Sequence, residues 1–480
     1  MGHAMCKCLR YACDKQLRRS STGLLLAVLL LPEGATKAQP LPLTKSPVPA
    51  VPALTLPEAL DYARTHQPEL RAARERFLAV AADARVPAAQ WLPSVGATAQ
   101  VLASSTNNST ATVLASRDVD LPRIGGTTIG SSPRWQPYAT TIGAVGLRQE
   151  VFDFGRIAAQ TAAGDALVAI ERDRLQLTRL DITLIVTQAY YAVRAAHAVL
   201  EAASQAEARA KVHSDFADVG VKSGLRPPIE RTRANADLTR FVVGRIRAEG
   251  NVRVARSVLA AAVGFPDPEL DSVDAAELVP TTPSLAQVEQ RTLAFQPEIL
   301  EARDRQQAQH AQTTAIAAAE RPNLFASASI SARAGGAPAN TGQVPEGQGF
   351  LPTIPNYDVG LVLSWPLYEP TIDAAVGASR QREWAYNAEL ASAQQKARTL
   401  AQQVYRRTRI AESALEALAQ AAVAARANYD QADARFRAGL GTSTELADAE
   451  ALRLDAEVQQ AVGGFELATA RAQLARVMGD

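Results

Sequence analysis

Residues that could carry catalytic or metal chemistry are few and scattered in this chain of 480 residues. Four of the five histidines, His66, His197, His213 and His310, lie far apart and lack the spacing of metal ligands. The three cysteines all lie within the first thirteen residues. We therefore expect no metal site and no cofactor in the body of the protein.

Two pairs of acids have residue types suited to acid–base catalysis, Asp153 with Asp165 and Asp433 with Glu445. Neither pair is accompanied by a partner histidine or a nucleophile motif, so solvated helix acids are the favoured interpretation. The formal net charge of +1 argues against a nucleic-acid binder, which carries a basic excess. The sequence therefore favours a protein that is not an enzyme and has no nucleic-acid partner.

The N-terminal residues 1–38 have the pattern of a secretory signal. A basic stretch precedes the apolar run from Gly23 to Leu31, and Pro32 ends that run. A run of about nine residues is too short to span a bilayer as a helix, although a retained anchor stays an alternative. We predict that residues 1–38 are removed on export and that the proline-rich residues 39–57 are extended.

The rest of the chain reads as two copies of one plan, residues 58–267 and 284–479, joined by a linker at 268–283. Four-residue and three-residue segments recur in the same order in both copies. Gln67-Pro68-Glu69-Leu70 recurs as Gln296-Pro297-Glu298-Ile299, and Ser223-Gly224-Leu225 recurs as Ala438-Gly439-Leu440. The ordered matches predict an internal duplication.

Each copy predicts a helix, two strands, a long helix and a last helix. Apolar residues of the long helices recur every three or four positions in two seams, which is typical of coiled-coil packing with a neighbour on both sides. The predicted helices lie at 57–90, 155–220 and 228–264 in the first copy and at 284–320, 371–437 and 443–478 in the second.

The predicted strands, at about 92–104, 138–151, 323–334 and 356–368, alternate apolar and polar residues, with the strand at 138–151 the least regular. Their length suits tilted membrane-spanning strands, although a soluble two-faced sheet gives the same alternation. Aromatic residues lie near the strand ends, where an interfacial girdle would sit: Trp91, Trp135, Tyr138, Phe152, Tyr357, Trp365 and Tyr368. Because four strands cannot close a membrane barrel, several chains must pool their strands.

In the order and spacing of its motifs, the chain resembles the TolC-type outer-membrane efflux proteins. The resemblance rests on the duplicated Pro-Glu openings, on residues 145–156 entering the long helix, and on Phe436-Arg437-Ala438-Gly439 leading to Glu445. It implies a mainly helical fold with membrane strands. Three chains would form a twelve-stranded barrel in the outer membrane and a long helical barrel in the periplasm. It also implies a periplasmic adaptor and an inner-membrane pump of RND, ABC or MFS type as partners.

The resemblance further implies a gate of inward-pointing acids near the helix–helix turns, which are marked by Gly224 and Gly439. The matching acids are Glu230, Glu445 and Asp448. The alternative is that these acids lie in first helical turns, where the helix dipole favours negative charge. The tyrosine and arginine that close the family's gate are matched by Phe436 and Gly441, so those two closing contacts are not expected as such.

The leading hypothesis is a passive exit duct of an efflux or type I secretion system, located in the cell outer membrane and extending into the periplasm. Outer-membrane lipid would surround its strands. The alternative is a secreted coiled-coil scaffold or interaction protein with a small soluble sheet. The transported substrate stays open, because the pump would choose it.

Overall fold

The computed structural model describes residues 52–480 except 106–118, 120–136, 274–282 and 336–353. The predicted signal at 1–38 and most of the proline-rich segment at 39–57 lie outside the described residues. All described residues belong to one compact unit, 51–480.

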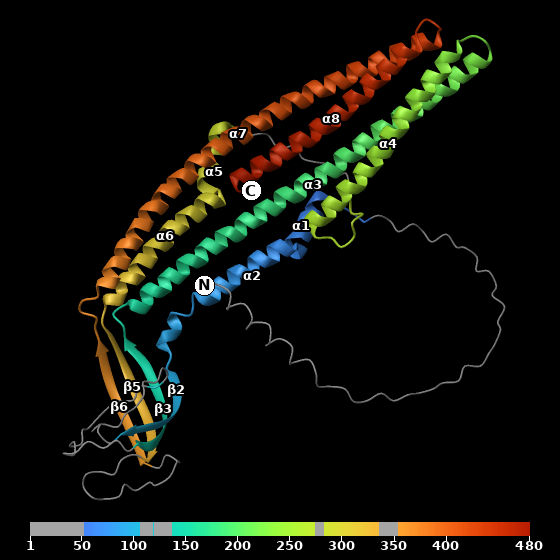
Figure 1. Cartoon of the computed structure of the whole chain (residues 1–480). Coiled ribbons are helices and arrows are strands. Elements are labelled where there is room, and N and C mark those ends of the chain that lie inside the picture. Colours follow the sequence, from blue (N-terminus) through green and yellow to red (C-terminus); the bar gives the residue numbers. More distant parts are fainter. Residues whose placement is uncertain (1–51, 106–118, 120–136, 274–282, 336–353) are drawn as a thin grey trace, which may run out of the picture. The chain divides into compact units, whose positions relative to one another are not determined.

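Two long helices run through this unit, α3 (Arg156–Lys222) and α7 (Pro370–Arg437). With 67 and 68 residues, each is roughly 100 Å long at 1.5 Å per residue. Each turns back into a shorter helix, α4 (Pro228–Val263) after α3 and α8 (Ser443–Met478) after α7. Helix α3 also packs against α8, so the two hairpins lie side by side (Figure 1).

The prediction of one continuous opening helix in each copy was wrong. Each is two helices, α1 (Leu56–His66) and α2 (Pro68–Asp83) in the first copy, α5 (Leu285–Phe295) and α6 (Pro297–Ala317) in the second. The breaks fall at Gln67 and Gln296, whose backbones are extended. Each precedes a proline, whose ring disfavours the helical conformation in the residue before it. Short 3₁₀ turns, η1 (Ala88–Trp91) and η2 (Ala318–Glu320), lead to the strands.

A four-stranded antiparallel sheet has the order β2-β3-β5-β6, so β2 and β6 are its edges. The strands are β2 (Ser94–Ser105), β3 (Pro137–Phe152), β5 (Asn323–Gly335) and β6 (Ile354–Ser364). Strand β6 ends at Ser364 rather than at 368 as predicted, because Pro366 follows and cannot donate to a ladder. A separate two-stranded sheet pairs β1 (Ala53–Leu54) with β4 (Asp271–Ser272).

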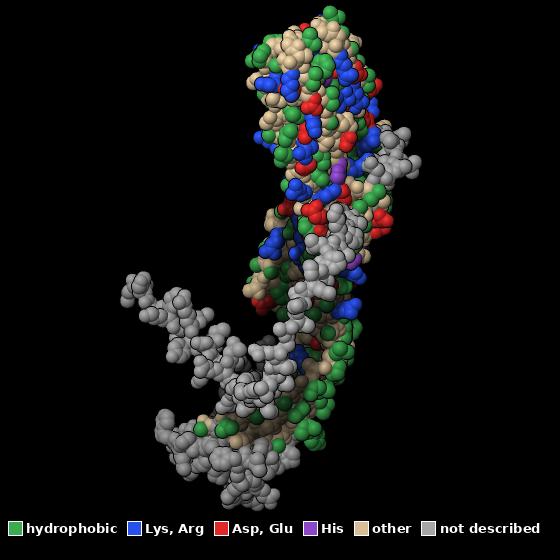
Figure 2. Space-filling model, turned by 90° about the vertical axis from the view of Figure 1, so that its right-hand side faces the viewer, with side chains coloured by type: hydrophobic (Ala, Val, Ile, Leu, Met, Phe, Trp, Pro, Cys, Tyr) green, Lys and Arg blue, Asp and Glu red, His purple; other side chains and the backbone are tan. Residues whose placement is uncertain are grey.

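Residues paired directly across neighbouring strands point to the same side of the sheet. The pairing therefore sorts the strand residues into an apolar face and a polar face. Val95, Leu147, Ala328 and Val359 form one row of the apolar face. Val359 is 82% exposed, so the described residues leave that face uncovered. Hydrophobic side chains predominate toward the sheet in Figure 2, whereas charged ones gather on the helices.

The core lies between the helices. Val186, Val193, Leu259 and Val263 are fully buried where α3 and α4 meet α1. A second cluster around Val404 joins α5, α7 and α8. None of the helices in the described part of the chain combines the length and apolar character needed to cross a bilayer.

Candidate functional site

The turns that end the two long helices have the same backbone. Gly224 and Gly439 both have φ +74°, the left-handed conformation that favours glycine at a helix end. Two residues after each glycine, the backbone N–H of Arg226 donates to Gly220 at 3.1 Å, and that of Gly441 donates to Arg435 at 3.1 Å. The duplicated segments therefore stop their helices in the same way.

Phe436 anchors the contact between the two turns. It is 2% exposed and packs against the rings of Phe216 and His213 on α3. The guanidinium carbon of Arg226 lies 4.0 Å from the centre of its ring, and Nη2 of Arg226 donates to the Phe436 carbonyl at 3.1 Å. A residue of the first turn thus holds the end of the second long helix by stacking and by a hydrogen bond.

The three acids predicted at the gate have different surroundings. Glu230 forms an ion pair with Arg226, at 2.7 Å, and its side chain is 20% exposed. Glu445 is exposed and accepts from the Thr442 N–H at 3.3 Å, while Thr442 Oγ1 accepts from the Glu445 N–H at 3.2 Å. Asp448 is exposed one turn later on α8. Within the described residues the three acids do not contact one another.

Sequence reasoning missed Arg226. Its signal was present, because Arg226 stands two residues after Gly224, just as Gly441 stands two residues after Gly439. The arginine that the family resemblance placed at Gly441 therefore occurs at the matching position of the other copy. Aligning the two copies with each other, rather than each with the family, would have identified it.

A charged network joins the hairpins farther from the turns. Arg209 on α3 donates to both carboxylate oxygens of Glu450 on α8, from Nε at 2.9 Å and from Nη2 at 2.8 Å. Glu450 is 2% exposed. Burial, reinforced by Glu450 and Asp433, raises the pKa of Tyr429 on α7 to about 12. Tyr429 therefore stays neutral at physiological pH and serves as a hydrogen-bonding group.

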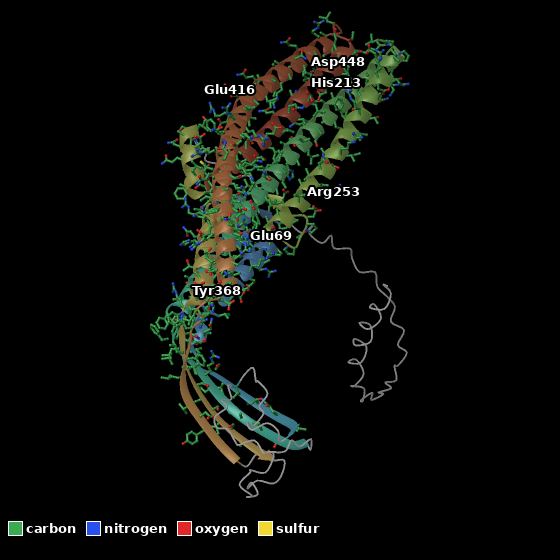
Figure 3. All side chains as sticks on the ribbon, turned by 60° about the vertical axis from the view of Figure 1, so that its left-hand side comes forward. Glu69, His213, Arg253, Tyr368, Glu416 and Asp448 are labelled. Atoms are coloured by element: carbon green, nitrogen blue, oxygen red, sulfur yellow. The ribbon has the colours of Figure 1, made fainter. Side chains whose placement is uncertain are left out.

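His213 joins this network to the turns. Its Nε2 lies 3.0 Å from Tyr429 Oη and 3.9 Å from Asp433 Oδ1, both on α7. Burial lowers the pKa of His213, with Arg437 and Arg209 adding to that effect and Asp433 opposing it. His213 is therefore neutral at pH 7 and bridges the hairpins without adding charge. Figure 3 shows His213 and Asp448 near the turn end, far from Tyr368 beside the sheet.

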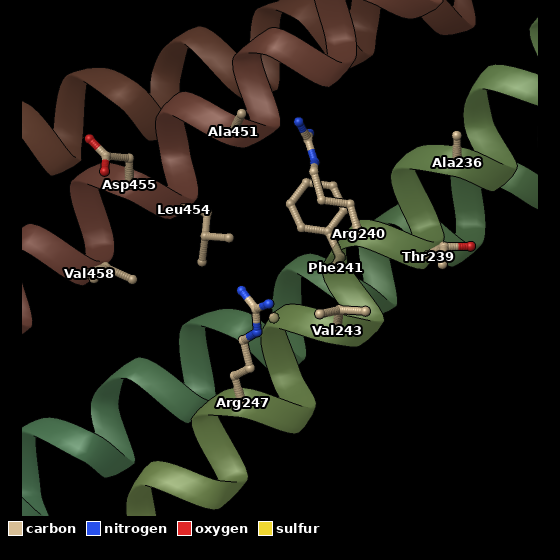
Figure 4. Close-up of a pocket in the computed structure, with 11 residues that line it drawn as sticks. Ala236, Thr239, Arg240, Phe241, Val243, Arg247, Ala451, Leu454, Asp455 and Val458 are labelled. Carbon is tan, nitrogen blue, oxygen red and sulfur yellow. The ribbon is translucent and has the colours of Figure 1, made fainter.

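A groove of about 700 Å³ lies between α4 and α8 (Figure 4). Its floor is apolar and includes Phe241 and Leu454, while Arg240 and Arg247 lie along its α4 side. In the described ranges no group of three or more His, Cys, Asp or Glu residues is placed to hold a metal ion. Asp153, considered in the sequence as a catalytic acid, instead accepts from backbone N–H groups at the start of α3, from Gly155 at 2.9 Å and from Ile157 in the first helical turn.

The predicted membrane-interface aromatics are exposed where their side chains are described. Trp135 lies outside the described residues, and only the backbone of Tyr138 is described. The others are 40% to 83% exposed near the helix-facing ends of the strands or, for Tyr357, within β6: Trp91, Phe152, Tyr357, Trp365 and Tyr368.

The sequence model of the family described as "Outer membrane efflux protein" matches residues 59–265 and 288–480, most of the chain. The chain belongs to the outer membrane efflux protein family. The resemblance inferred from the sequence is thereby confirmed. Among curated proteins, none matches this chain in sequence.

Solved structures of similar fold include outer-membrane proteins and channels. The CmeC channel of Campylobacter jejuni is 14% identical with a TM-score of 0.70, over 88% of this chain and 85% of that one. VceC of Vibrio cholerae is 18% identical with a TM-score of 0.67, over 88% and 96%. The open state of MtrE from Neisseria gonorrhoeae is 17% identical with a TM-score of 0.66, over 90% and 93%.

Membership of this family confirms the predicted class of protein, its location and its fold. The chain is a non-enzymatic transport protein of the outer membrane that extends into the periplasm. Its mainly helical, duplicated fold is that of channels that assemble as trimeric barrels. Channels of this family are homotrimers that work with adaptors and inner-membrane pumps. The alternative of a secreted coiled-coil scaffold protein therefore gives way to a transport protein.

Proposed function

We propose that three copies of this chain form the exit duct of a tripartite efflux or type I secretion system. The duct passively conducts substrate delivered by an inner-membrane pump of RND, ABC or MFS type through a periplasmic adaptor. The observation that carries this proposal is the sheet, with its uncovered apolar face and two open edges. Such a face and such edges are stable in lipid only when other strands complete a barrel.

The strand directions allow copies of this chain to close a barrel together. In a sheet that alternates up and down, edge strands β2 and β6 run in opposite directions. β6 of one copy can therefore pair antiparallel with β2 of the next, and three copies of four strands make twelve. The apolar face then meets lipid on the outside, and the polar face lines the lumen.

The test is the chemically cross-linked mass of the protein in isolated outer membranes. We expect a trimer that only detergent releases. A soluble monomer or dimer in the periplasmic fraction would contradict the pooled barrel. An adaptor-binding measurement with RND-, ABC- and MFS-type adaptors in turn then decides the pump class.

At the turn end we propose a gate in which Glu230, Glu445 and Asp448 are repeated by threefold symmetry and Arg226 with Phe436 holds the hairpins together. Rings of carboxylates attract cations and set selectivity. Glu445→Ala combined with Asp448→Ala is expected to lower the cation preference of single channels. Unchanged selectivity in that double variant would remove both residues from the gate.

The aromatic side chains beside the strands are proposed to lie at the membrane–water interface. Trp365→Ala is expected to weaken retention of the protein in liposomes. Removal of two of these aromatic side chains together should weaken it further, because each contributes a separate contact with the interface. Residues 1–38 are proposed to be a signal that is removed on export, and N-terminal sequencing of the membrane form tests the cleavage position.

A further inference from the structure

Two phenylalanines lie side by side where strand β3 leads into helix α3. Phe152 is the last residue of β3 and pairs with Leu324 of β5. Leu324 lies four residues before Ala328, so it belongs to the apolar face of the sheet, and Phe152 points to that side as well. The ring of Phe154 meets the ring of Phe152 edge-on, with 4.6 Å between the ring centres. The two rings therefore form one apolar patch at the helix-facing end of the apolar face.

The patch is exposed although the backbone beneath it is strained. Phe152 and Phe154 are 53% and 46% exposed. Phe154 has φ +52°, and among the described residues only glycines share such a positive φ. This conformation is unfavourable for a bulky residue, so it persists only where its surroundings impose it, commonly at functional sites. The exposed ring of Phe154 therefore indicates a contact outside this chain.

Hydrogen bonds on both sides of Phe154 impose that conformation. The Asp153 carboxylate accepts from the Gly155 N–H at 2.9 Å, and Nη1 of Arg321 donates to the Phe154 carbonyl at 3.1 Å. Arg321 is an exposed residue between the 3₁₀ turn η2 and strand β5. Its hydrogen bond therefore places a guanidinium group beside the apolar patch.

Arg321 brings a positive charge to this place. A guanidinium group has five N–H donors, and the bond to the Phe154 carbonyl uses one of them without neutralising the charge. Among the described residues no acid forms an ion pair with Arg321. Arg156, at the start of α3, is by contrast paired with Glu150 at 3.2 Å. The patch therefore combines exposed apolar rings with a cation that can bind an anionic group.

We propose that Phe152, Phe154 and Arg321 bind an anionic phospholipid in the periplasmic leaflet of the outer membrane. The helix-facing ends of the strands are their periplasmic ends, because the helices extend into the periplasm (Figure 1). Arg321 contacts the phosphate group, and the two rings contact the acyl chains. A headgroup with a net negative charge is favoured over a zwitterionic one, because a cation at the membrane surface attracts anionic lipid. This inference rests on the proposed barrel, whose apolar face meets lipid.

The test uses native mass spectrometry of trimers released from nanodiscs made of equal parts phosphatidylglycerol and phosphatidylethanolamine. We expect wild-type trimers to retain phosphatidylglycerol in preference, and Arg321→Gln to lower the retained amount about fivefold. Arg321→Lys keeps the charge and should retain most of the lipid. Inorganic phosphate should not displace the lipid, because it cannot contact the rings. Displacement by phosphate would overturn the lipid site in favour of a simple anion site.

Phe154→Gly separates lipid binding from the stability of the fold. Glycine adopts a positive φ without strain, so the melting temperature of this variant in detergent should be equal or higher, while retention of phosphatidylglycerol falls. Phe295→Ala is the matched control, because Phe295 is 60% exposed at the end of α5, away from the sheet. It should leave lipid retention unchanged.

The outcomes distinguish the lipid site from the barrel. Wild-type trimers that retain both lipids equally would overturn the site and leave the barrel intact. A lower melting temperature of Phe154→Gly with unchanged lipid retention would show that Phe154 serves packing instead. A wild-type chain that does not enter nanodiscs would overturn the barrel itself.

Discussion

The two turns of the hairpins share a backbone and differ in what holds them. Both stop a long helix with a left-handed glycine, Gly224 or Gly439. The first turn then reaches across to the other hairpin through Arg226. The second turn is held locally, by the capping box of Thr442 and Glu445. Duplication has thus kept the helix stop in both copies and left the long-range contact in only one, so the hairpins are not interchangeable parts of the gate.

The largest expected effect comes from removing the anchor that both turns share. Phe436→Ala should lower the free energy of opening at the turn end by about 3–5 kcal/mol, since it removes a fully buried aromatic side chain. Hydrogen exchange of the backbone amides in both turns measures this as faster opening. Leu440→Ala is the matched control, because Leu440 is 76% exposed. Equal exchange in the two variants would show that Phe436 does not join the hairpins.

A second prediction concerns Arg226→Gly, which gives the first turn the glycine that the second turn has at the matching position 441. Arg226→Gly removes a charge-assisted hydrogen bond and a stacking contact, together worth about 2–4 kcal/mol, and frees Glu230 from its ion pair. We expect a higher resting conductance of single channels in planar bilayers.

The reverse substitution is not expected to compensate. A Cβ atom at Gly441 would lie 3.1 Å from the Phe436 backbone nitrogen and 3.3 Å from Arg435, too close for an easy fit. Gly441→Arg in the Arg226→Gly background should therefore leave the conductance high. Restored closure would mean that either turn can carry the arginine.

A third, smaller effect should stay within the second turn. Thr442→Ala removes the cap of α8 and should cost about 1 kcal/mol. Amides in the first turn of α8 should exchange faster, while those of α4 stay unchanged. Ser443→Ala, one position later, keeps the cap and serves as the control. Faster exchange in α4 as well would show that the second turn is also coupled over long range.

The smallest effect is a pH dependence carried by His213. Its pKa is lowered in the packed hairpins, so the packed state prefers neutral His213 and an opened state takes up the proton more readily. The contribution of His213 to packing is complete above its ordinary pKa and is lost as pH falls below that value. Resting conductance should rise between pH 7 and pH 5. In His213→Gln this rise should be weaker, and an identical rise would assign it to other groups.

Much of this architecture could be predicted from residue patterns because its determinants are local. Period-two alternation placed three of the four strands clearly and the strand at 138–151 less regularly, and apolar seams placed both long helices. Gly224 and Gly439 marked the turns, since a left-handed helix end has few alternatives to glycine. The breaks at Gln67 and Gln296 were readable too, from Pro68 and Pro297, but the apolar periodicity on either side masked them.

The gate chemistry depended on contacts between residues far apart in the chain. The sequence by itself determined that the protein carries a duplicated helical unit, a two-faced sheet and acids after each turn, since each follows from spacing within one segment. Only the tertiary structure decided that Arg226 stacks on Phe436 and that Arg148 lies over Phe325. The packing of α3 against α8 and the pairing of β3 with β5 bring those residues together, and no local pattern encodes such pairings.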